Sequence, residues 1–361
     1  MMTDNNKTRI VVGLSGGVDS SAAASLLVDQ GYDVVGITLK VWPQDCVSRA
    51  EDKCCGPQAV MDARSVADKL DIPYYLVDES KEFQRDVIDY FATEYKAGRT
   101  PNPCVMCNEK LKFGNLINRA RKLGAEYVAT GHYARLEQRD GRTVLLRGRD
   151  VRKDQTYFLF SLGQEQLAHM MFPLGELQKI ETRKVARCVN LKTAEKQESQ
   201  EICFVPDKDY KKFLTTSGLV DEHRGEIVDT RGQVLGHHDG IEFYTIGQRK
   251  GLGISAPTPM YVIELDPENN RVVVGGEELL LRDEFRIDRC NWIAFDRLAK
   301  PIEASAAIRY NHPGTEASII PGENGQATVK LREPQRAVTP GQACVFYQDD
   351  LVVGGGWIMR N

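Results

Sequence analysis

The first 205 residues alternate short β-branched runs with longer amphipathic segments. Residues 8–14 and 33–42 have the pattern of strands, and residues 20–30 between them have that of a helix that ends at Gly31. The alternation continues through helices expected at 57–70, 80–96 and 109–122 and strands expected at 74–78 and 127–134. Strands that alternate with helices are typical of βαβ units, in which the strands run parallel. We therefore predict an α/β domain with a parallel sheet at 8–205.

After residue 205 the pattern becomes that of an all-β chain, with frequent glycines and apolar stretches of strand length. The sequence Asp-Pro-Glu-Asn-Asn at 266–270 supplies turn-forming residues between strands expected at 261–265 and 271–274. Further short strands are expected at 242–246, 302–310, 327–331, 343–347 and 351–357. We expect a small β-rich central domain at 206–281 and a C-terminal β-barrel domain at 282–361.

Composition excludes several classes of protein. Residues 1–10 lack the apolar core of a signal peptide, and no run of 18 or more uncharged apolar residues is present. The nine cysteines are an odd number and are irregularly spaced, unlike a secreted disulfide framework. We therefore expect a cytoplasmic protein with no membrane partner, some of whose cysteines take part in redox, sulfur or metal chemistry.

A glycine-rich loop joins the first expected strand to the first expected helix. It consists of Gly13, Leu14, Ser15, Gly16, Gly17, Val18, Asp19 and Ser20. Glycines let a backbone approach phosphate oxygens, and the helix that follows presents free N–H groups and the positive end of its dipole. The loop lacks the lysine of a Walker A sequence and the Gly-x-Gly-x-x-Gly of dinucleotide-binding proteins. The alternative is an ordinary strand-to-helix turn without a ligand.

A second loop, at 100–108, combines two prolines with a Cys-x-x-Cys pair. Cys104 and Cys107 form the pair, and Cys203 is a further candidate downstream. With a helix starting near Glu109, Cys107 lies beside the helix N-terminus, where the dipole lowers the pKa of a thiol. One such pair is compatible with a redox site, half of a zinc site or part of an iron–sulfur site. The other cysteines are a doublet without an assigned role, Cys54 and Cys55, and four singles expected to be small buried side chains, Cys46, Cys188, Cys290 and Cys344.

Taken together, these loops resemble those of one family, the tRNA-specific 2-thiouridylases, which belong to the PP-loop N-type ATP pyrophosphatases. The matching segments run in order over nearly the whole chain: 13–20, 100–103, 107–108, 129–134, 153–158, 200–204, 244–253, 308–310 and 340–342. The resemblance implies an adenine nucleotide alpha hydrolase-like fold for the first domain and tRNA binding by the central one. It also implies ATP-dependent 2-thiolation of the wobble uridine of tRNA.

In that reaction ATP adenylates the O2 oxygen of the uridine with release of pyrophosphate, and sulfur then displaces AMP. The resemblance places ATP on residues 13–20, on the backbone of Leu39 and on Gly131, with Asp19 helping to hold Mg²⁺. A uracil carbonyl is a poor electrophile until its oxygen is adenylated, and the base must leave its stack to expose C2. The expected partners are the tRNA anticodon stem-loop and a sulfur-relay protein or cysteine desulfurase.

The same resemblance leaves two sulfur routes open. In one, Cys203 carries a persulfide, and Cys107 attacks it to release sulfide or to form a disulfide. In the other, thiolates of Cys104, Cys107 and Cys203 hold a 4Fe–4S cluster with one open iron. Many family members have Asp where this chain has Cys104, so an acid–base role at that position does not carry over to a thiol.

Basic residues are concentrated in one stretch although the whole chain has a net charge of −4. Residues 108–153 contain twelve Lys or Arg against five Asp or Glu, a pattern of either a solvated face or an RNA-binding face. By resemblance, the residues around the target base are Asn102, Pro103 and Cys104, and further tRNA contacts come from His132, Lys153, Asp154, Gln155, Arg309, Tyr310 and Gln342.

Two other classes of function remain alternatives. A PP-loop synthetase would adenylate a small substrate and use a nitrogen nucleophile, which requires no essential cysteine. An RNA-binding or iron–sulfur protein with an inactive nucleotide loop would not consume ATP, and the intact residues at 15–20 argue against it.

Overall fold

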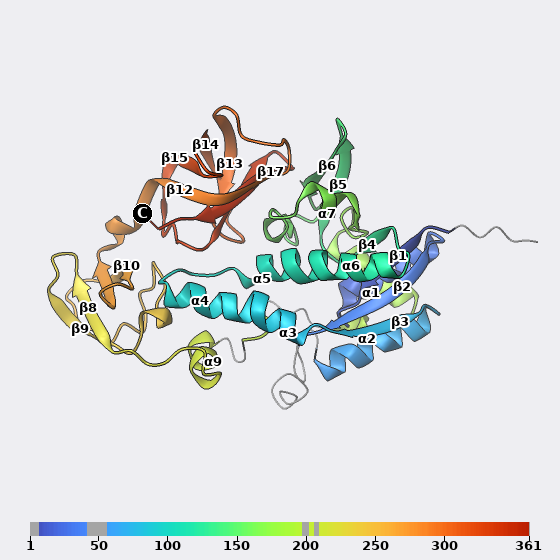
Figure 1. Cartoon of the computed structure of the whole chain (residues 1–361), viewed down its shortest axis with the longest axis horizontal. Coiled ribbons are helices and arrows are strands. Elements are labelled where there is room, and N and C mark those ends of the chain that lie inside the picture. Colours follow the sequence, from blue (N-terminus) through green and yellow to red (C-terminus); the bar gives the residue numbers. More distant parts are fainter. Residues whose placement is uncertain (1–6, 42–55, 197–201, 206–208, 361) are drawn as a thin grey trace, which may run out of the picture. The chain divides into compact units, whose positions relative to one another are not determined.

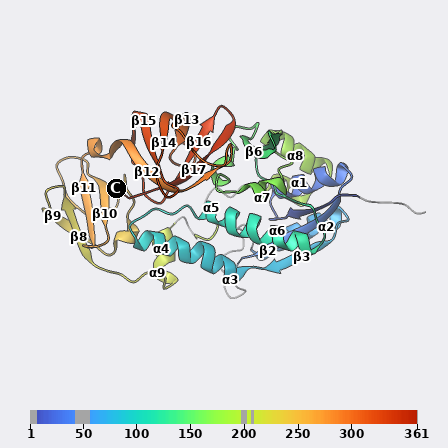
Figure 2. The ribbon, with the colours of Figure 1, turned by 45° about the horizontal axis from the view of Figure 1, so that its top comes forward.

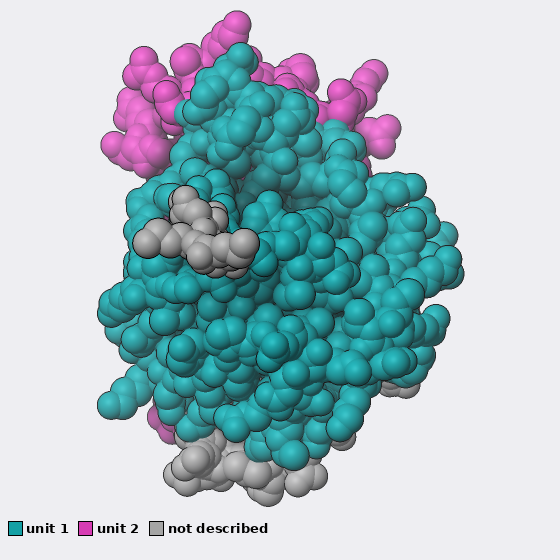
Figure 3. All heavy atoms as spheres, turned by 90° about the vertical axis from the view of Figure 1, so that its right-hand side faces the viewer, with its two compact units in different colours: residues 1–86, 104–208, 350–352 teal, residues 87–103, 209–349, 353–361 magenta. Residues whose placement is uncertain are grey.

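The computed structural model describes residues 7–41, 56–196, 202–205 and 209–360. It divides into two compact units, coloured separately in Figure 3. The first unit contains residues 1–86, 104–208 and 350–352, and the second contains 87–103, 209–349 and 353–361.

A five-stranded parallel sheet in the order β3-β2-β1-β4-β7 forms the centre of the first unit. Its strands are β1 (Arg9–Gly13), β2 (Asp33–Lys40), β3 (Tyr74–Asp78), β4 (Tyr127–Ala129) and β7 (Met170–Met171). The chain passes from β1 to one side of the sheet and then returns to the other side of β1 at β4. Ligands of open α/β sheets bind at such a switch point, at the carboxyl ends of the strands. The parallel α/β fold predicted from the sequence is confirmed.

Helices pack on this sheet (Figure 1). They are α1 (Val18–Asp29), α2 (Pro57–Lys69) and α6 (Leu116–Lys122). Helix α8 (Lys179–Cys188) packs on α1 and on the single turn η5 (Lys192–Glu195). Helix α7 (Gln164–Ala168) and the single turn η4 (Thr156–Phe158) pack on β6 (Arg142–Arg147), which forms a hairpin with β5 (Ala134–Arg139). Buried Ile10 and Val12 of β1 pack with Ala24 and Leu27 of α1 in one apolar core. The small residues of α1 let this helix lie close to the sheet, which fixes the loop between β1 and α1.

The expected helix at 80–96 is present but contains a π-helical segment. Its parts are α3 (Ser80–Phe83), η2 (Gln84–Asp89) and α4 (Tyr90–Lys96). π-helical turns occur inside α-helices often at functional sites.

The helix expected to start near Glu109 starts at Pro103 instead, and this prediction was wrong. Its parts are α5 (Pro103–Met106), a π-helical segment η3 (Cys107–Asn115) and α6. Proline fits the first helical position because its missing N–H would have no partner there. Cys107 therefore lies inside the helix rather than in front of it.

The second unit contains a four-stranded sheet in the order β10-β11-β8-β9 and a barrel. The sheet consists of β8 (Gly225–Asp229), β9 (Val234–His238), β10 (Tyr261–Asp266) and β11 (Arg271–Gly275), with α9 (Tyr210–Thr216) and the single turns η7 (Ile241–Phe243) and η8 (Glu277–Leu280). The hairpin expected around 266–270 is confirmed: Asp266 Oδ1 accepts from the N–H groups of Glu268 and Asn269, both at 3.2 Å.

The strand expected at 242–246 was wrong, because Ile241–Phe243 form a single 3₁₀ turn. Ile241, Glu242, Phe243 and Tyr244 are all buried, so the in-and-out alternation of a half-buried strand is absent.

The C-terminal barrel is closed by pairing of its first strand with its last. Its strands are β12 (Leu281–Trp292), β13 (Ile302–Ala307), β14 (Thr315–Pro321), β15 (Ala327–Arg336), β16 (Ala343–Gln348) and β17 (Leu351–Ile358), labelled in Figure 2. Buried Ile287, Ile319, Val329 and Phe346 fill its interior. The predicted C-terminal β-barrel is thus confirmed.

Candidate functional site

The glycine-rich loop at the end of β1 is held by its own hydroxyl groups. Ser20 Oγ lies 3.1 Å from the Ser15 nitrogen and donates to the Gly17 carbonyl at 3.2 Å, while Ser21 Oγ donates to the same carbonyl at 2.7 Å. Thr38 Oγ1 of β2 donates to the Leu14 carbonyl at 2.6 Å. These bonds fix the loop without a ligand. They also show that the Ser20 hydroxyl group shapes the loop.

The predicted nucleotide-binding residues gather at one edge of the sheet. Gly16 has φ of +69° and its α-carbon faces the backbone of Ala59, so both its conformation and its surroundings require glycine. Gly131 follows β4, and a Cβ built on it would lie 2.6 Å from the Asp19 carbonyl carbon. Leu39 lies in β2, next to Thr38, whose side chain bonds the loop. The loop, Leu39 and Gly131 therefore surround the switch point between β1 and β4.

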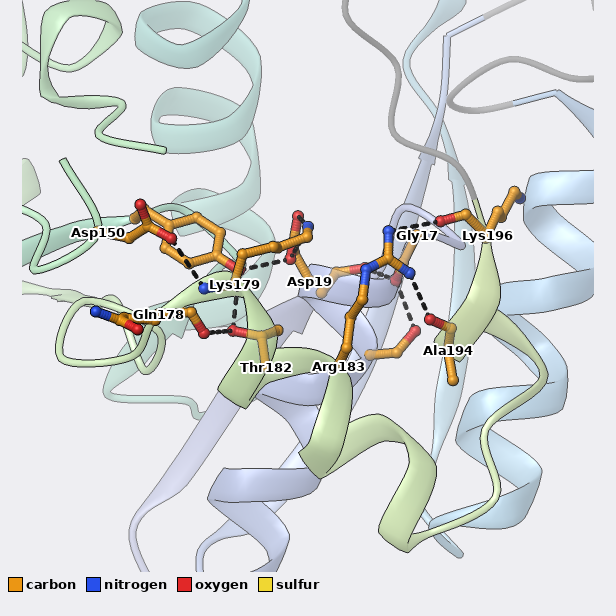
Figure 4. A network of polar contacts seen from close by, with 12 residues as sticks. Gly17, Asp19, Asp150, Gln178, Lys179, Thr182, Arg183, Ala194 and Lys196 are labelled. Carbon is orange, nitrogen blue, oxygen red and sulfur yellow. Dashed lines mark hydrogen bonds and ion pairs between the residues drawn. The ribbon is translucent and has the colours of Figure 1, made fainter. Parts of the chain in front are cut away.

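Asp19 in the first turn of α1 is the centre of a polar network, drawn in Figure 4. Its carboxylate oxygens lie 2.6 and 2.8 Å from Lys179 Nζ of α8, and Tyr133 OH donates to Oδ1 at 2.9 Å. A second lysine, Lys196, donates to the Gly16 carbonyl at 3.1 Å. No motif in the sequence indicated either lysine, because each is more than 150 residues from the loop and only the fold brings it there.

The cysteines of the proposed sulfur chemistry all belong to the first unit. Cys104 is exposed, whereas Cys107 and Cys203 are partly buried. Among the residues that the structure describes, these three included, no three His, Cys, Asp or Glu side chains converge as a metal site.

The structure assigns different surroundings to the remaining cysteines. Cys188 is exposed at the end of α8, so its expected burial was wrong. Cys290 and Cys344 lie in the barrel, where burial raises the pKa of the Cys290 thiol to about 12 and that of Cys344 further still. Cys46, Cys54 and Cys55 lie outside the described residues.

A buried carboxylate holds the helix that carries Cys107. Glu79, at the end of β3, is 1% exposed and accepts from Asn115 Nδ2 at 2.7 Å and from Arg119 Nη2 at 3.1 Å. Next to Cys107, Asn108 is buried and donates from Nδ2 to the Phe158 carbonyl at 3.0 Å. The π-helical segment is thus anchored at both its ends.

Three residues expected to contact tRNA from the first unit point inward. Asp154 accepts from Gly148 N at 3.0 Å and Thr156 Oγ1 at 2.8 Å, and burial raises the pKa of its carboxyl group. Gln155 Oε1 accepts from Tyr133 N at 3.0 Å. His132 is only 8% exposed and its Nδ1 lies 2.8 Å from Thr130 Oγ1. In this conformation Asp154 bonds within the segment that carries Lys153, Gln155 joins that segment to Tyr133, and His132 bonds Thr130.

The buried imidazole gives a testable pH dependence. Burial, and secondarily the charge of Lys112, holds the pKa of His132 well below its usual range. The unfolded chain therefore takes up a proton near pH 6.5 that the folded chain does not, so folding stability falls as the pH drops below 6.5, by up to about 1.4 kcal/mol per pH unit. We expect His132→Asn, which keeps a polar atom for Thr130, to flatten this fall in urea denaturation between pH 7 and 5. Parallel curves for the variant and the wild type would contradict the assignment.

The residues expected to contact tRNA from the second unit fall into two groups. Arg309 and Tyr310 follow β13, and both are exposed. Gln342 donates from Nε2 to the carbonyls of Thr100 and Pro101, both at 3.1 Å. It thereby holds the segment that leads to Asn102 and Pro103, both of which are buried.

Acidic residues neutralise much of the basic stretch at 108–153. Ion pairs join Lys110 to Glu109, Arg119 to Glu79, Arg121 to Glu165, Arg135 to Asp350, Arg139 to Glu137, Arg147 to Asp154 and Arg149 to Glu181. Most of these acids lie outside the stretch, so its local charge surplus overstated the basic character of the folded surface.

Comparison with known proteins identifies the family of the chain. Residues 8–207 match the tRNA methyl transferase HUP domain, residues 211–276 the tRNA methyl transferase PRC-barrel domain and residues 282–358 the aminomethyltransferase beta-barrel domain. The chain is 49% identical over 353 residues to the tRNA-specific 2-thiouridylase MnmA of Clostridium perfringens, covering 98% of each protein. It belongs to the tRNA-specific 2-thiouridylase family.

Other members of the 2-thiouridylase family are similarly close. The protein from Moorella thermoacetica is 50% identical over 351 residues, covering 96% of this chain and 98% of the relative. Among solved structures, the U34-tRNA thiolase NcsA from Methanococcus maripaludis, with its [4Fe-4S] cluster, matches at 17% identity with a TM-score of 0.35, covering 56% of this chain and 63% of that one.

Within the described residues, no helix has the length and apolar character needed to cross a membrane.

Proposed function

We propose that this chain is an ATP-dependent tRNA sulfurtransferase that converts the wobble uridine of tRNA to 2-thiouridine in the cytoplasm. The proposal rests on a sequence identity of 49–50% to tRNA-specific 2-thiouridylases over 96–98% of the chain. It is supported by the intact glycine-rich loop at the switch point of the sheet. In this proposal residues 8–205 perform the chemistry, and the domains at 206–281 and 282–361 bind tRNA.

The glycine-rich loop is the proposed site of adenylation. Its backbone N–H groups and the N-terminus of α1 would bind the β and γ phosphates of ATP, with Leu39 and Gly131 lining the nucleotide site. The Asp19 carboxylate is 30% exposed and accepts from Lys179 Nζ and Tyr133 OH. Carboxylate oxygens are ligands that Mg²⁺ prefers, so Asp19 would be its ligand here. Mg²⁺ bound there would neutralise charge on the leaving pyrophosphate.

Sulfur transfer is proposed to use Cys203 and Cys107. Cys203 would receive a persulfide sulfur from a relay protein or cysteine desulfurase, and the Cys107 thiolate would attack the inner sulfur of that persulfide. This attack breaks the S–S bond of the persulfide, releases the outer sulfur as sulfide and forms a Cys107–Cys203 disulfide, which an external thiol reductant would reduce before the next turnover. The sulfide released would add to C2 of the adenylated uracil, and AMP would leave with the former O2 oxygen. A 4Fe–4S cluster on Cys104, Cys107 and Cys203 is the alternative route.

The tRNA itself is proposed to contact both units. Asn102, Pro103 and Cys104 would surround the target base, Lys153 its phosphates, and Arg309 and Tyr310 the anticodon loop. Buried His132 and Asp154, and the bonded Gln155 and Gln342, would act by shaping these loops or would contact RNA only after rearrangement.

A thiolation assay tests the proposal. Protein purified without oxygen is incubated with tRNA, ATP and a persulfide donor, and the tRNA is run on a mercury-containing gel. We expect ATP-dependent retardation of a tRNA with U34 and none of a matched tRNA with C34. Consumption of ATP with ammonia but no retardation would instead support a nitrogen-using synthetase.

Iron measured on the same preparation separates the sulfur routes. We expect a colourless protein without stoichiometric iron that is fully active with the persulfide donor. About four irons per chain, with activity lost on their removal, would replace the persulfide route by the cluster route.

A further inference from the structure

Helix α8 supplies the glycine-rich loop with a lysine that its own sequence lacks. Lys179 is the first residue of α8, and its Nζ bonds both oxygens of Asp19, at 2.6 and 2.8 Å (Figure 4). The Lys179 side chain is 12% exposed and that of Asp19 is 30% exposed. A lysine this buried needs a negative partner, and here the partner is the residue that we propose as the Mg²⁺ ligand.

Several hydrogen bonds fix the start of α8 and therefore the position of Lys179. The Lys179 backbone N–H donates to Asp150 Oδ2 at 2.9 Å, and the Glu181 carboxylate caps the Gln178 N–H at 2.7 Å. Tyr133 OH links Asp19 to Thr182 of α8, with both oxygens at 2.9 Å. These bonds direct the Lys179 side chain at the loop.

A second lysine, Lys196, binds the other side of the loop. Lys196 Nζ lies 3.1 Å from the Gly16 carbonyl oxygen and 2.7 Å from Asp62 Oδ2. Arg183 of α8 donates to the carbonyls of Ala194 and Lys196 at 2.5 and 3.2 Å, which ties this segment to the same helix. Helix α8 therefore organises positive charge on both sides of the loop.

The Lys179–Asp19 pair cannot simply admit a metal ion. A Mg²⁺ ion on Asp19 and the Lys179 ammonium group on the same carboxylate would repel each other, because both are positive and close together. Mg²⁺ on Asp19 with Lys179 still in contact would therefore be disfavoured. The conflict is removed when a polyphosphate arrives with the metal, because its oxygens can accept the ammonium group.

We propose that Lys179 is a pyrophosphate-binding residue. In the empty loop it is the counter-ion of Asp19, and on entry of ATP with Mg²⁺ its ammonium group moves to the β and γ phosphates and stays with the leaving pyrophosphate. Metal binding at Asp19 is thereby coupled to the presence of polyphosphate. The inference rests on the proposed function in assuming cleavage between the α and β phosphates.

The test measures two affinities of the full-length protein without tRNA. Calorimetric titrations with Mn²⁺ alone, and with inorganic pyrophosphate in the presence of Mg²⁺, are made on the wild type, Lys179→Met, Lys179→Arg and Lys184→Met. Lys184 is exposed on the same helix and serves as the matched control. For Lys179→Met we expect pyrophosphate affinity to fall about tenfold or more and Mn²⁺ affinity to rise severalfold. The affinities of Lys184→Met and Lys179→Arg for pyrophosphate and for Mn²⁺ should both stay within about threefold of the wild-type values, because both variants retain the charge at position 179.

Opposite shifts of the two affinities in Lys179→Met are the signature of the proposal. A purely structural lysine would instead lower both affinities and the melting temperature together, and that result would overturn it. Unchanged pyrophosphate binding in Lys179→Met would overturn it too, as would an equal loss in Lys179→Arg. Thiolation by the wild type is scored separately: a protein that binds pyrophosphate through Lys179 but does not thiolate tRNA would refute the proposed function and leave this inference standing.

Discussion

The Cys107→Ser and Cys203→Ser variants are expected to form pyrophosphate from ATP and tRNA at close to the wild-type single-turnover level, yet to form no detectable 2-thiouridine. In the proposed function, adenylation depends on the loop at the switch point, whereas sulfur transfer depends on the thiols of Cys107 and Cys203. A serine oxygen is a far weaker nucleophile than a thiolate and cannot carry a transferable sulfur atom. The loss of thiolation should therefore be at least about 10³-fold, as for removal of an enzyme nucleophile.

Both steps can be read from the same reaction, with labelled ATP for pyrophosphate and a mercury gel for sulfur. Cys188→Ser is the matched control, since Cys188 is exposed at the end of α8 and has no part in the proposed chemistry. Full thiolation by Cys107→Ser would disprove the persulfide route as written. Loss of pyrophosphate formation in either variant would place that cysteine in the adenylation step instead.

The sequence was sufficient for those features that depend on neighbouring residues. The alternation of strands and helices predicted the parallel sheet, and the turn residues at 266–270 predicted their hairpin, because side-chain periodicity and turn chemistry are local properties. The glycine-rich loop could also be recognised from its own residues, between an expected strand and an expected helix, and it lies where the strand order reverses.

What the sequence concealed depends on contacts between distant segments. Lys179 lies 160 positions from Asp19, and no local pattern distinguishes it from other lysines on the surface of a helix. The charge surplus at 108–153 likewise suggested an open basic face, but acids such as Glu79 and Glu165 come from elsewhere in the chain to neutralise it. The start of the Cys107 helix was misplaced for a different reason: Pro103 was interpreted as part of a stiff loop, although proline is equally suited to the first turn of a helix.

Replacing Gly131 by alanine is expected to impair nucleotide binding. A Cβ at this position would lie 2.6 Å from both the Asp19 carbonyl carbon and the Ser20 nitrogen, and 2.9 Å from Asp19 Cβ. The obstructing atoms are mainly backbone atoms of the first turn of α1, which cannot rotate away as a side chain can. The turn must therefore move away from β4, which displaces the Asp19 carboxylate and the N–H groups meant for phosphate.

We expect Gly131→Ala to lower the free energy of unfolding by about 1–3 kcal/mol, as overpacking of a buried site does. Affinity for a non-hydrolysable ATP analogue should fall about 10- to 100-fold, because displacements near 1 Å have costs of that order in a preorganised site. Gly163→Ala is the control: Gly163 has φ of −79°, and its nearest neighbour to an added Cβ is Gln166 Oε1 at 3.9 Å. Equal affinity of Gly131→Ala and the wild type for the analogue would contradict this prediction. It would mean that the first turn of α1 can shift without loss of affinity, so that the close approach of the segment after β4 does not set the geometry of the loop.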